Sequence, residues 1–233
     1  MKVNEKIRAF TLIELLVVVA IISLLVSILM PSLNQAKKLA KCTMCKSNLF
    51  NIGTAICQYA DEYNERLPSI YAGLQNCCAY WFYYDQEFRN LGLLAKAGFF
   101  SCQTDIVFCP SWKAGSAASE SSHGVQSHIN CISGSQLAAT DASLGWTHKR
   151  SSYFRRVLDD DGNRIVSLSD IGPQAWLGDL FVFPVHIQDC HGDGINTWYG
   201  DGHVEYNNID MALLEEISSS ENWQNIWDVI IVR

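Results

Sequence analysis

Histidine and aspartate side chains gather near the C-terminus with a spacing that could bind a metal ion. In an extended segment, alternate residues point to one face of the backbone, and a following hairpin brings further side chains close. Carboxylates and imidazoles are common protein ligands of calcium and zinc. The simpler interpretation is a hairpin in which the histidine hydrogen-bonds the turn, so we expect no metal and no cofactor. The residues concerned are Asp189, His191, Asp193, Asp201 and His203.

The nine cysteines are the second group that could do chemistry. Cys42 and Cys45 are one helical turn apart, but a zinc site needs two further ligands, and the chain has no second C-x-x-C pair. A redox dithiol normally lies at the start of a helix that follows a strand, whereas these two follow a long apolar run. We therefore expect disulfides, within the chain or to neighbouring subunits, as in other extracytoplasmic proteins. The sequence does not determine their pairing.

The remaining polar motifs do not predict a site. Asp159-Asp160-Asp161-Gly162-Asn163 is acidic, but it lacks the spaced ligands and closing glutamate of a calcium-binding helix–loop–helix. We expect a solvated hairpin turn there. The chain has no G-x-S-x-G, H-E-x-x-H or phosphate-binding loop motif. The sequence therefore predicts a protein that is not an enzyme.

The element that must position these groups is a long helix that begins with an apolar run from Phe10 to Met30. As a helix, this run is about 30 Å long, which is the thickness of a bilayer core. Glu14 is unusual in it, because a carboxylate at mid-membrane costs roughly 2.5–3.5 kcal/mol and normally has a partner and a role. The polar exceptions in the run are Thr11, Glu14, Ser23 and Ser27.

The order Ala9-Phe10-Thr11-Leu12-Ile13-Glu14 resembles the cleavage and methylation motif of type IV prepilins and type II secretion pseudopilins. The resemblance implies that a prepilin peptidase cuts between Ala9 and Phe10 and methylates the new amine of Phe10. It also implies that Glu14 faces the N-terminal amine of a neighbouring subunit and sets the register of assembly. Such a pair is physically reasonable, because the two charges compensate each other inside an apolar bundle. Ala9 stands where the family usually has glycine.

Two other interpretations of the N-terminus are a cleaved signal peptide and a plain signal anchor. A signal peptide has an apolar core of about 7–15 residues followed by an A-x-A-like site. This core is longer, and residues 30–34 offer no such site. A plain anchor fits the length but leaves Glu14 unexplained.

Two arguments about membrane orientation disagree. By the positive-inside rule, the lysines after the apolar run place the C-terminal side in the cytoplasm. The prepilin resemblance places the leader there instead, because the peptidase acts at the inner face, and we follow the resemblance. The lysines are Lys37, Lys38, Lys41 and Lys46.

A second resemblance lies near the C-terminus. His191 is followed nine residues later by Asp201-Gly202, which resembles the H-X9-DG element at the C-terminus of a large group of prepilin-like proteins. The segments 197–199 and 203–206 are β-prone and flank Asp201-Gly202, so they predict a hairpin. Cys109-Pro110-Ser111 also lies where that group commonly has similar residues.

These features predict an α+β, pilin-like fold, in which a long N-terminal helix packs on a C-terminal antiparallel β-rich domain. We expect a leader at 1–9, a helix at 10–64 with 10–30 in the membrane, and an extracytoplasmic domain at 65–233 with the hairpin at 191–202. Leu67-Pro68 would stop the long helix. Within the domain, residues 91–100 predict a short helix and 115–122 a loop. Strands are predicted at 80–84 (alternatively a buried helix), 106–109, 125–132, 153–157, 165–168 and 176–182.

The sequence therefore predicts a structural prepilin-like subunit that is processed by a prepilin peptidase and assembled into a type IV pilus or a type II secretion pseudopilus. The expected partners are like subunits through the N-terminal helix, the peptidase and inner-membrane lipid. A net charge of −7 argues against nucleic acid. The expected location is the inner membrane, single-pass, with the C-terminal domain outside. The alternative function is a membrane-anchored surface binding module that recognises polysaccharide or protein.

Overall fold

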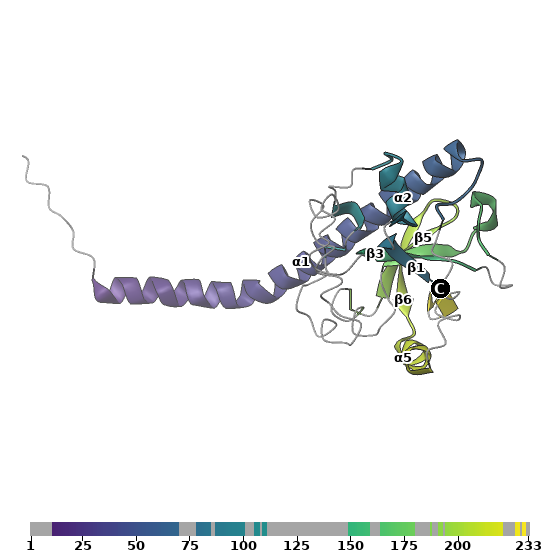
Figure 1. The fold of residues 1–233 in the computed structure, drawn as a ribbon. Coiled ribbons are helices and arrows are strands. Elements are labelled where there is room, and N and C mark those ends of the chain that lie inside the picture. The colour runs from purple at the N-terminus through teal and green to yellow at the C-terminus, as the bar shows by residue number, and fades with distance from the viewer. Residues whose placement is uncertain are drawn as a thin grey trace, which may run out of the picture. The chain divides into compact units, whose positions relative to one another are not determined.

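The computed structural model (Figure 1) forms two compact units, Met1–Ala40 and Lys41–Arg233. The residues that it describes are 11–69, 78–84, 87–100, 105–107, 109–110, 149–158, 164–179, 187, 191–192, 194–220, 227–228 and 230–231.

The first unit consists of the N-terminal part of helix α1 (Leu12–Glu62). Every side chain from residue 11 to residue 40 is exposed. Its serines bond to the helix's own carbonyls: Ser23 Oγ donates to Val19 O at 2.8 Å and Ser27 Oγ to Leu24 O at 2.7 Å. A hydroxyl satisfied in this way can lie in lipid without a water partner. Pro31 lies inside the helix and does not end it.

In the second unit, the same helix has one buried face. The buried residues recur every three to four positions, which is the spacing of one side of a helix. The opposite side is exposed, as Met44 and Phe50 show with 56% and 54% of their surface accessible. α1 ends at Glu62, close to the predicted end and before Pro68. The buried residues are Cys45, Leu49, Ile52, Gly53, Ala55, Ile56 and Ala60.

The β-rich part is one antiparallel sheet with the strand order β2-β1-β3-β4-β5-β6-β7 among the described residues. Apart from β2, the strands are adjacent in chain order, so the sheet is a meander. Both edge strands have only two residues each. The predicted α+β fold with a long helix and an antiparallel sheet is confirmed. The strands are β1 (Cys78–Tyr84), β2 (Glu87–Phe88), β3 (Lys149–Arg156), β4 (Ala175–Asp179), β5 (Gly194–Tyr199), β6 (Val204–Ile209) and β7 (Ile230–Ile231).

Two apolar clusters hold this unit together. The larger joins the buried face of α1 to Tyr153, Trp176 and Trp198 on the sheet and to helix α2 (Leu91–Lys96). Gly53 lies where α1 meets the sheet, and a Cβ at this position would overlap the Trp198 indole. A glycine that weakens the helix by about 1 kcal/mol therefore allows the two elements to approach closely. The smaller cluster places helix α5 (Met211–Ser220) against Ile195, Ile209, Trp227 and Ile230.

Several local predictions are confirmed. The aromatic segment at 80–84 is a strand, part of β1, rather than a helix. α2 ends at Lys96 and is followed by Gly98, whose φ of 88° is the left-handed conformation that commonly follows a helix. The segments predicted as strands at 153–157 and 176–182 overlap β3 and β4, although 180–182 lie outside the described residues.

Two strand predictions are wrong. Asp105–Val107 forms the 3₁₀ helix η1 where a strand was expected at 106–109. The segment 165–168 is also not a strand, because Ser167 caps the 3₁₀ helix η5 (Leu168–Asp170) and makes only an isolated bridge to Arg66. A short apolar run does not distinguish a strand from other buried structure. At 165–168, the capping box formed by Ser167 and Asp170 favours a 3₁₀ helix.

Other predictions lie outside the described residues. These are the loop at 115–122, the strand at 125–132 and the acidic turn at 159–163. The residues on either side of that turn, Leu158 and Arg164, form an antiparallel bridge, as a hairpin requires.

Candidate functional site

Thr11 and Glu14 hydrogen-bond each other and cap the start of α1. The Thr11 backbone N–H and hydroxyl donate to Glu14 Oε2 at 2.9 and 2.8 Å, and the Glu14 N–H donates to Thr11 Oγ1 at 3.3 Å. This is a capping box, which satisfies donors that the first helical turn leaves open. Glu14 therefore stabilises the helix start within a single chain. Ala9 and Phe10, the predicted cleavage and methylation residues, lie outside the described residues.

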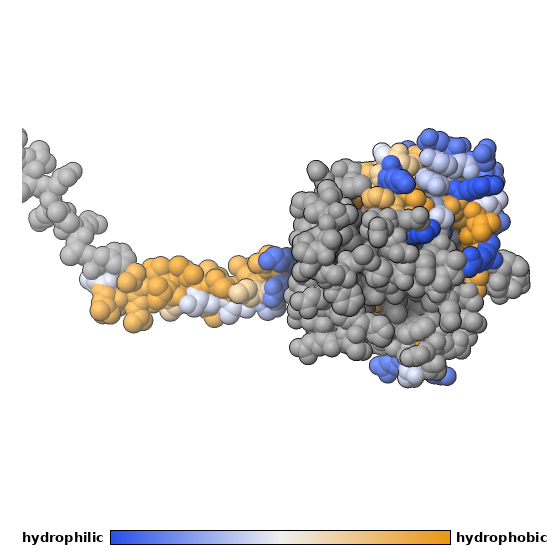
Figure 2. All heavy atoms as spheres, in the orientation of Figure 1, coloured by the Kyte–Doolittle hydropathy of each residue, from blue (hydrophilic) through white to orange (hydrophobic). Residues whose placement is uncertain are grey.

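The first part of α1 has a continuous apolar surface (Figure 2). The exposed side chains include Leu12, Ile13, Ile28 and Leu33, each more than half accessible. By length and composition, α1 is suited to cross a membrane. A helix that is apolar on every side needs either lipid or other apolar helices around it.

The predicted hairpin is confirmed as β5 and β6, with Asp201-Gly202 in the connecting turn. Gly202 has a φ of 93°, and its N–H donates to Tyr199 O at 2.9 Å. Asp201 Oδ1 accepts hydrogen bonds from the His203 backbone N–H and from the His203 ring. These bonds, the backbone one foremost, lower the pKa of the Asp201 carboxyl. Asp201 and Gly202 thus shape the turn, as the simpler interpretation predicted.

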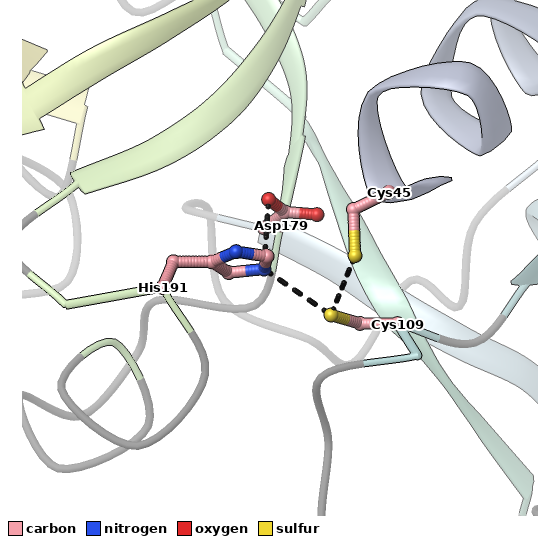
Figure 3. Close-up of side chains that lie close together, drawn as sticks. All are labelled: Cys45, Cys109, Asp179 and His191. Carbon is pink, nitrogen blue, oxygen red and sulfur yellow. Dashed lines mark hydrogen bonds and ion pairs between the residues drawn. The ribbon is translucent and has the colours of Figure 1, made fainter. Parts of the chain in front are cut away.

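His191 lies at the other end of β5 from the turn, a separation of about 20 Å along a six-residue strand. It therefore does not hydrogen-bond the turn, and that part of the prediction is wrong. Asp189 and Asp193 lie outside the described residues. The His191 ring instead enters a buried cluster with Cys45, Cys109 and Asp179 (Figure 3).

The cluster is compact and comes from four separate segments (Figure 3). His191 Nε2 is 3.2 Å from Asp179 Oδ2 and 3.2 Å from Cys109 Sγ, and Cys109 Sγ is 2.7 Å from Cys45 Sγ. Cys45 projects from α1, Cys109 follows η1, Asp179 ends β4 and His191 precedes β5. The side chains of Asp179 and His191 are each 2% exposed.

Neighbouring groups fix this arrangement. The backbone N–H and side-chain amide of Asn196 donate to Asp179 Oδ2 at 3.0 and 2.9 Å. The His191 N–H donates to Ile187 O at 2.8 Å, and the Tyr206 hydroxyl donates to His191 O at 3.0 Å. Asn196 of β5 therefore holds the Asp179 carboxylate, and Ile187 and Tyr206 hold the backbone of His191.

Burial and mutual contact shift the ionisation of the cluster. Burial raises the pKa of Asp179 to about 7, against the opposing effect of His191 and the Asn196 hydrogen bonds. Burial alone would lower the pKa of His191, but the neighbouring Cys109 and Cys42 thiols and the charge of Asp179 raise it to about 11. The Cys45 thiol has its pKa raised by its hydrogen bond with Cys109, by burial and by the charge of Asp179.

No disulfide joins any two of Cys42, Cys45, Cys57 and Cys109, the cysteines whose side chains the structure describes. The disulfides expected from the sequence are therefore not found among these residues. Cys45 points to Cys109, and Cys42 lies beside Asn196.

The sequence identified His191 but not its partners. In the sequence, Cys109-Pro110 stands out only through the resemblance to the H-X9-DG group of proteins. Cys45 stands out only as part of the C-x-x-C pair with Cys42. One feature of the sequence could have identified Asp179 as a site residue, because it is a carboxylate inside a run of apolar strand residues. A buried acid in such a run needs a partner.

Comparison with known proteins matches residues 6–30 to the prokaryotic N-terminal methylation motif. The chain carries a prepilin-type methylation motif. The motif supports a type IV pilin-like protein, and it implies processing by a prepilin peptidase and assembly with other pilins. Together with the long apolar helix, it fits a single-pass anchor in the inner membrane. No curated protein and no solved structure matches the chain. The H-X9-DG resemblance stays a prediction.

Proposed function

We propose that the chain is a structural pilin-like subunit that is cut between Ala9 and Phe10, methylated at Phe10 and assembled through its N-terminal helix into a type IV pilus or type II secretion pseudopilus. The match over residues 6–30 carries this proposal. The exposed apolar surface of α1 supports it as well, because that surface must be covered by lipid before assembly and by like helices afterwards.

Glu14 has two tasks in this proposal. Its Oε2 atom caps the helix by accepting from Thr11. After cleavage, the carboxylate also compensates the new amine of Phe10 on a neighbouring subunit. Removing one partner of a buried ion pair costs about 3–5 kcal/mol, because the other charge stays buried without compensation. The negative charge of Glu14 is therefore required for assembly, in addition to its capping.

Processing is tested on protein recovered from the membranes of a host that has a prepilin peptidase and of a host that lacks it. The expected product in the first host begins at Phe10 and carries one extra methyl group, as read by N-terminal sequencing and intact mass. The second host should yield a chain that begins at Met1. If both hosts yield Met1, the proposal fails, and a membrane-anchored binding module becomes the better explanation.

Assembly is tested with Glu14→Val and a matched control, Ser23→Val. Both replace a polar residue of the apolar run by valine, but Ser23 Oγ is satisfied by Val19 O of its own helix. We expect Glu14→Val to abolish recovery of chains in a sheared or cross-linked filament fraction, and Ser23→Val to leave it unchanged. Filaments of normal yield from Glu14→Val would show that the charge has no role in assembly.

A further inference from the structure

The four side chains of the buried cluster are all groups that bind metals. The Sγ atoms of Cys45 and Cys109, a carboxylate oxygen of Asp179 and a ring nitrogen of His191 lie within 4.8 Å of one another. Thiolate, imidazole and carboxylate are the ligands of zinc in proteins, and four of them in a closed group are typical of a structural site. We propose that Cys45, Cys109, Asp179 and His191 bind a zinc ion in tetrahedral geometry.

The spacing of the ligand atoms is close to what zinc requires. Around a tetrahedral zinc, typical bond lengths place nitrogen and oxygen ligands about 3.3 Å apart, and nitrogen and sulfur about 3.6 Å apart. The corresponding separations here are 3.2 Å for His191 Nε2 to Asp179 Oδ2 and 3.2 Å for His191 Nε2 to Cys109 Sγ. Two of the ligand pairs are therefore already set for a common metal ion.

The two sulfur atoms must separate slightly to bind zinc. They are 2.7 Å apart, whereas two sulfurs on a tetrahedral zinc are about 3.8 Å apart. A rotation of about 20° at each cysteine χ1 moves each sulfur by about 0.6 Å and stays within one staggered rotamer. Two such rotations in opposite directions would open the distance between the sulfurs to about 3.8 Å.

Burial and charge also favour a cation at this position. Among the described residues, Asp179 Oδ1 is buried and has no hydrogen-bond partner, so the carboxylate has an oxygen that can bind a metal ion. A buried carboxylate needs positive charge beside it, which a protonated His191 supplies in the absence of a metal ion. A divalent ion does this for the carboxylate and both thiolates together. Asn196, which donates to Asp179 Oδ2, then acts as the group that orients a ligand.

The competing explanation is a Cys45–Cys109 disulfide. It accounts for the contact between the two sulfurs, but it does not involve Asp179 and His191, which would then form a buried ion pair of their own. The zinc site uses all four residues and explains why α1, the segment after η1, β4 and the start of β5 converge at one point. It would link the buried face of α1 to the sheet.

The test uses the full-length protein, purified in detergent under reducing conditions and titrated with Co²⁺ as a probe for zinc. We expect about one Co²⁺ per chain, with the visible bands of tetrahedral cobalt and a thiolate-to-cobalt charge-transfer band in the near ultraviolet. Zn²⁺ should displace the cobalt and remove both signals. If reduced protein gives neither band, the site is refuted, and this result does not depend on any variant.

Variants then assign the ligands. Cys109→Ser and His191→Ala should lower cobalt affinity at least tenfold, and Cys109→Ser should weaken the charge-transfer band. The matched controls are Cys57→Ser and His203→Ala, which change the same residue types outside the cluster and should bind like the wild type. Unchanged binding in the ligand variants refutes the assignment. So does a Cys45–Cys109 disulfide in protein alkylated directly in membranes and mapped by mass spectrometry.

Discussion

Gly53 and Trp198 lie so close together that Gly53→Ala should destabilise the wild-type protein but stabilise a variant that lacks Trp198. A Cβ at Gly53 would lie 2.5 Å from Cε2 and 2.6 Å from Cδ1 of Trp198, where ordinary contact begins near 3.4 Å. The indole would have to move by about 1 Å, but it is 1% exposed and packs edge-on against Trp176, whose ring centroid is 5.9 Å away. Overpacking of this kind costs about 1–3 kcal/mol.

Gly53→Ala also brings a gain, because alanine favours a helix interior over glycine by about 1 kcal/mol. The contact should exceed this gain, so we expect a net destabilisation of up to about 2 kcal/mol in the wild-type background. Trp198→Leu removes the obstructing ring. In that background, Gly53→Ala should stabilise the protein by up to about 1 kcal/mol, which gives a coupling energy of about 1–3 kcal/mol between the two positions.

The assay is urea unfolding of the full-length chain in detergent, followed by circular dichroism so that the loss of a tryptophan does not affect the signal. Thr54→Ala is the control, because Thr54 is the next residue of α1 and is exposed. It should change stability by no more than about 0.5 kcal/mol. If Gly53→Ala stabilises the wild-type protein as much as it stabilises Trp198→Leu, α1 does not contact the sheet as described.

Two further predictions concern the hairpin and the proposed metal site. Gly202→Ala should lower stability by about 1 kcal/mol, because the φ of 93° is strained for alanine although no atom lies within 4 Å of its Cβ; an equal loss in Gly202→Asn, a residue that adopts the left-handed region more readily, would contradict this reason. Asn196→Ala should weaken cobalt binding by about 10–100-fold with unchanged stoichiometry, because it removes the amide that donates to Asp179. Wild-type affinity in this variant would mean that Asn196 does not orient the ligand.

Local patterns were enough to predict the elements that depend on neighbours in sequence. The apolar run from Phe10 and the helical spacing of Leu49, Ile52 and Ile56 gave α1 nearly to its observed end. Asp201-Gly202 predicted the β5–β6 hairpin, because a glycine readily adopts the left-handed conformation that closes a short hairpin loop, as Gly202 does here. Predictions failed where an apolar run was too short to show a period, as at Ile106 and Val107.

The candidate site was less predictable, because it depends on contacts between distant segments. His191 was found from its residue type and spacing, but its partners come from positions as far apart as Cys45 and Asp179. The sequence order of Asp201 and His203 suggested that they join His191, whereas the length of β5 separates them. Only the register of the sheet and the packing of α1 on it decide which polar groups share a buried space.

The two-residue edge strands have a consequence for the proposed assembly, which would place many copies of the chain side by side. A long, flat edge exposes unpaired backbone groups that can recruit the edge of another chain. Here the described sheet ends in β2 and β7, and each offers only a few such groups. Subunits crowded side by side would therefore have little opportunity to fuse sheet to sheet. Assembly of the proposed filament would depend on the N-terminal helix, whereas uncontrolled aggregation would depend on the edges of the sheet.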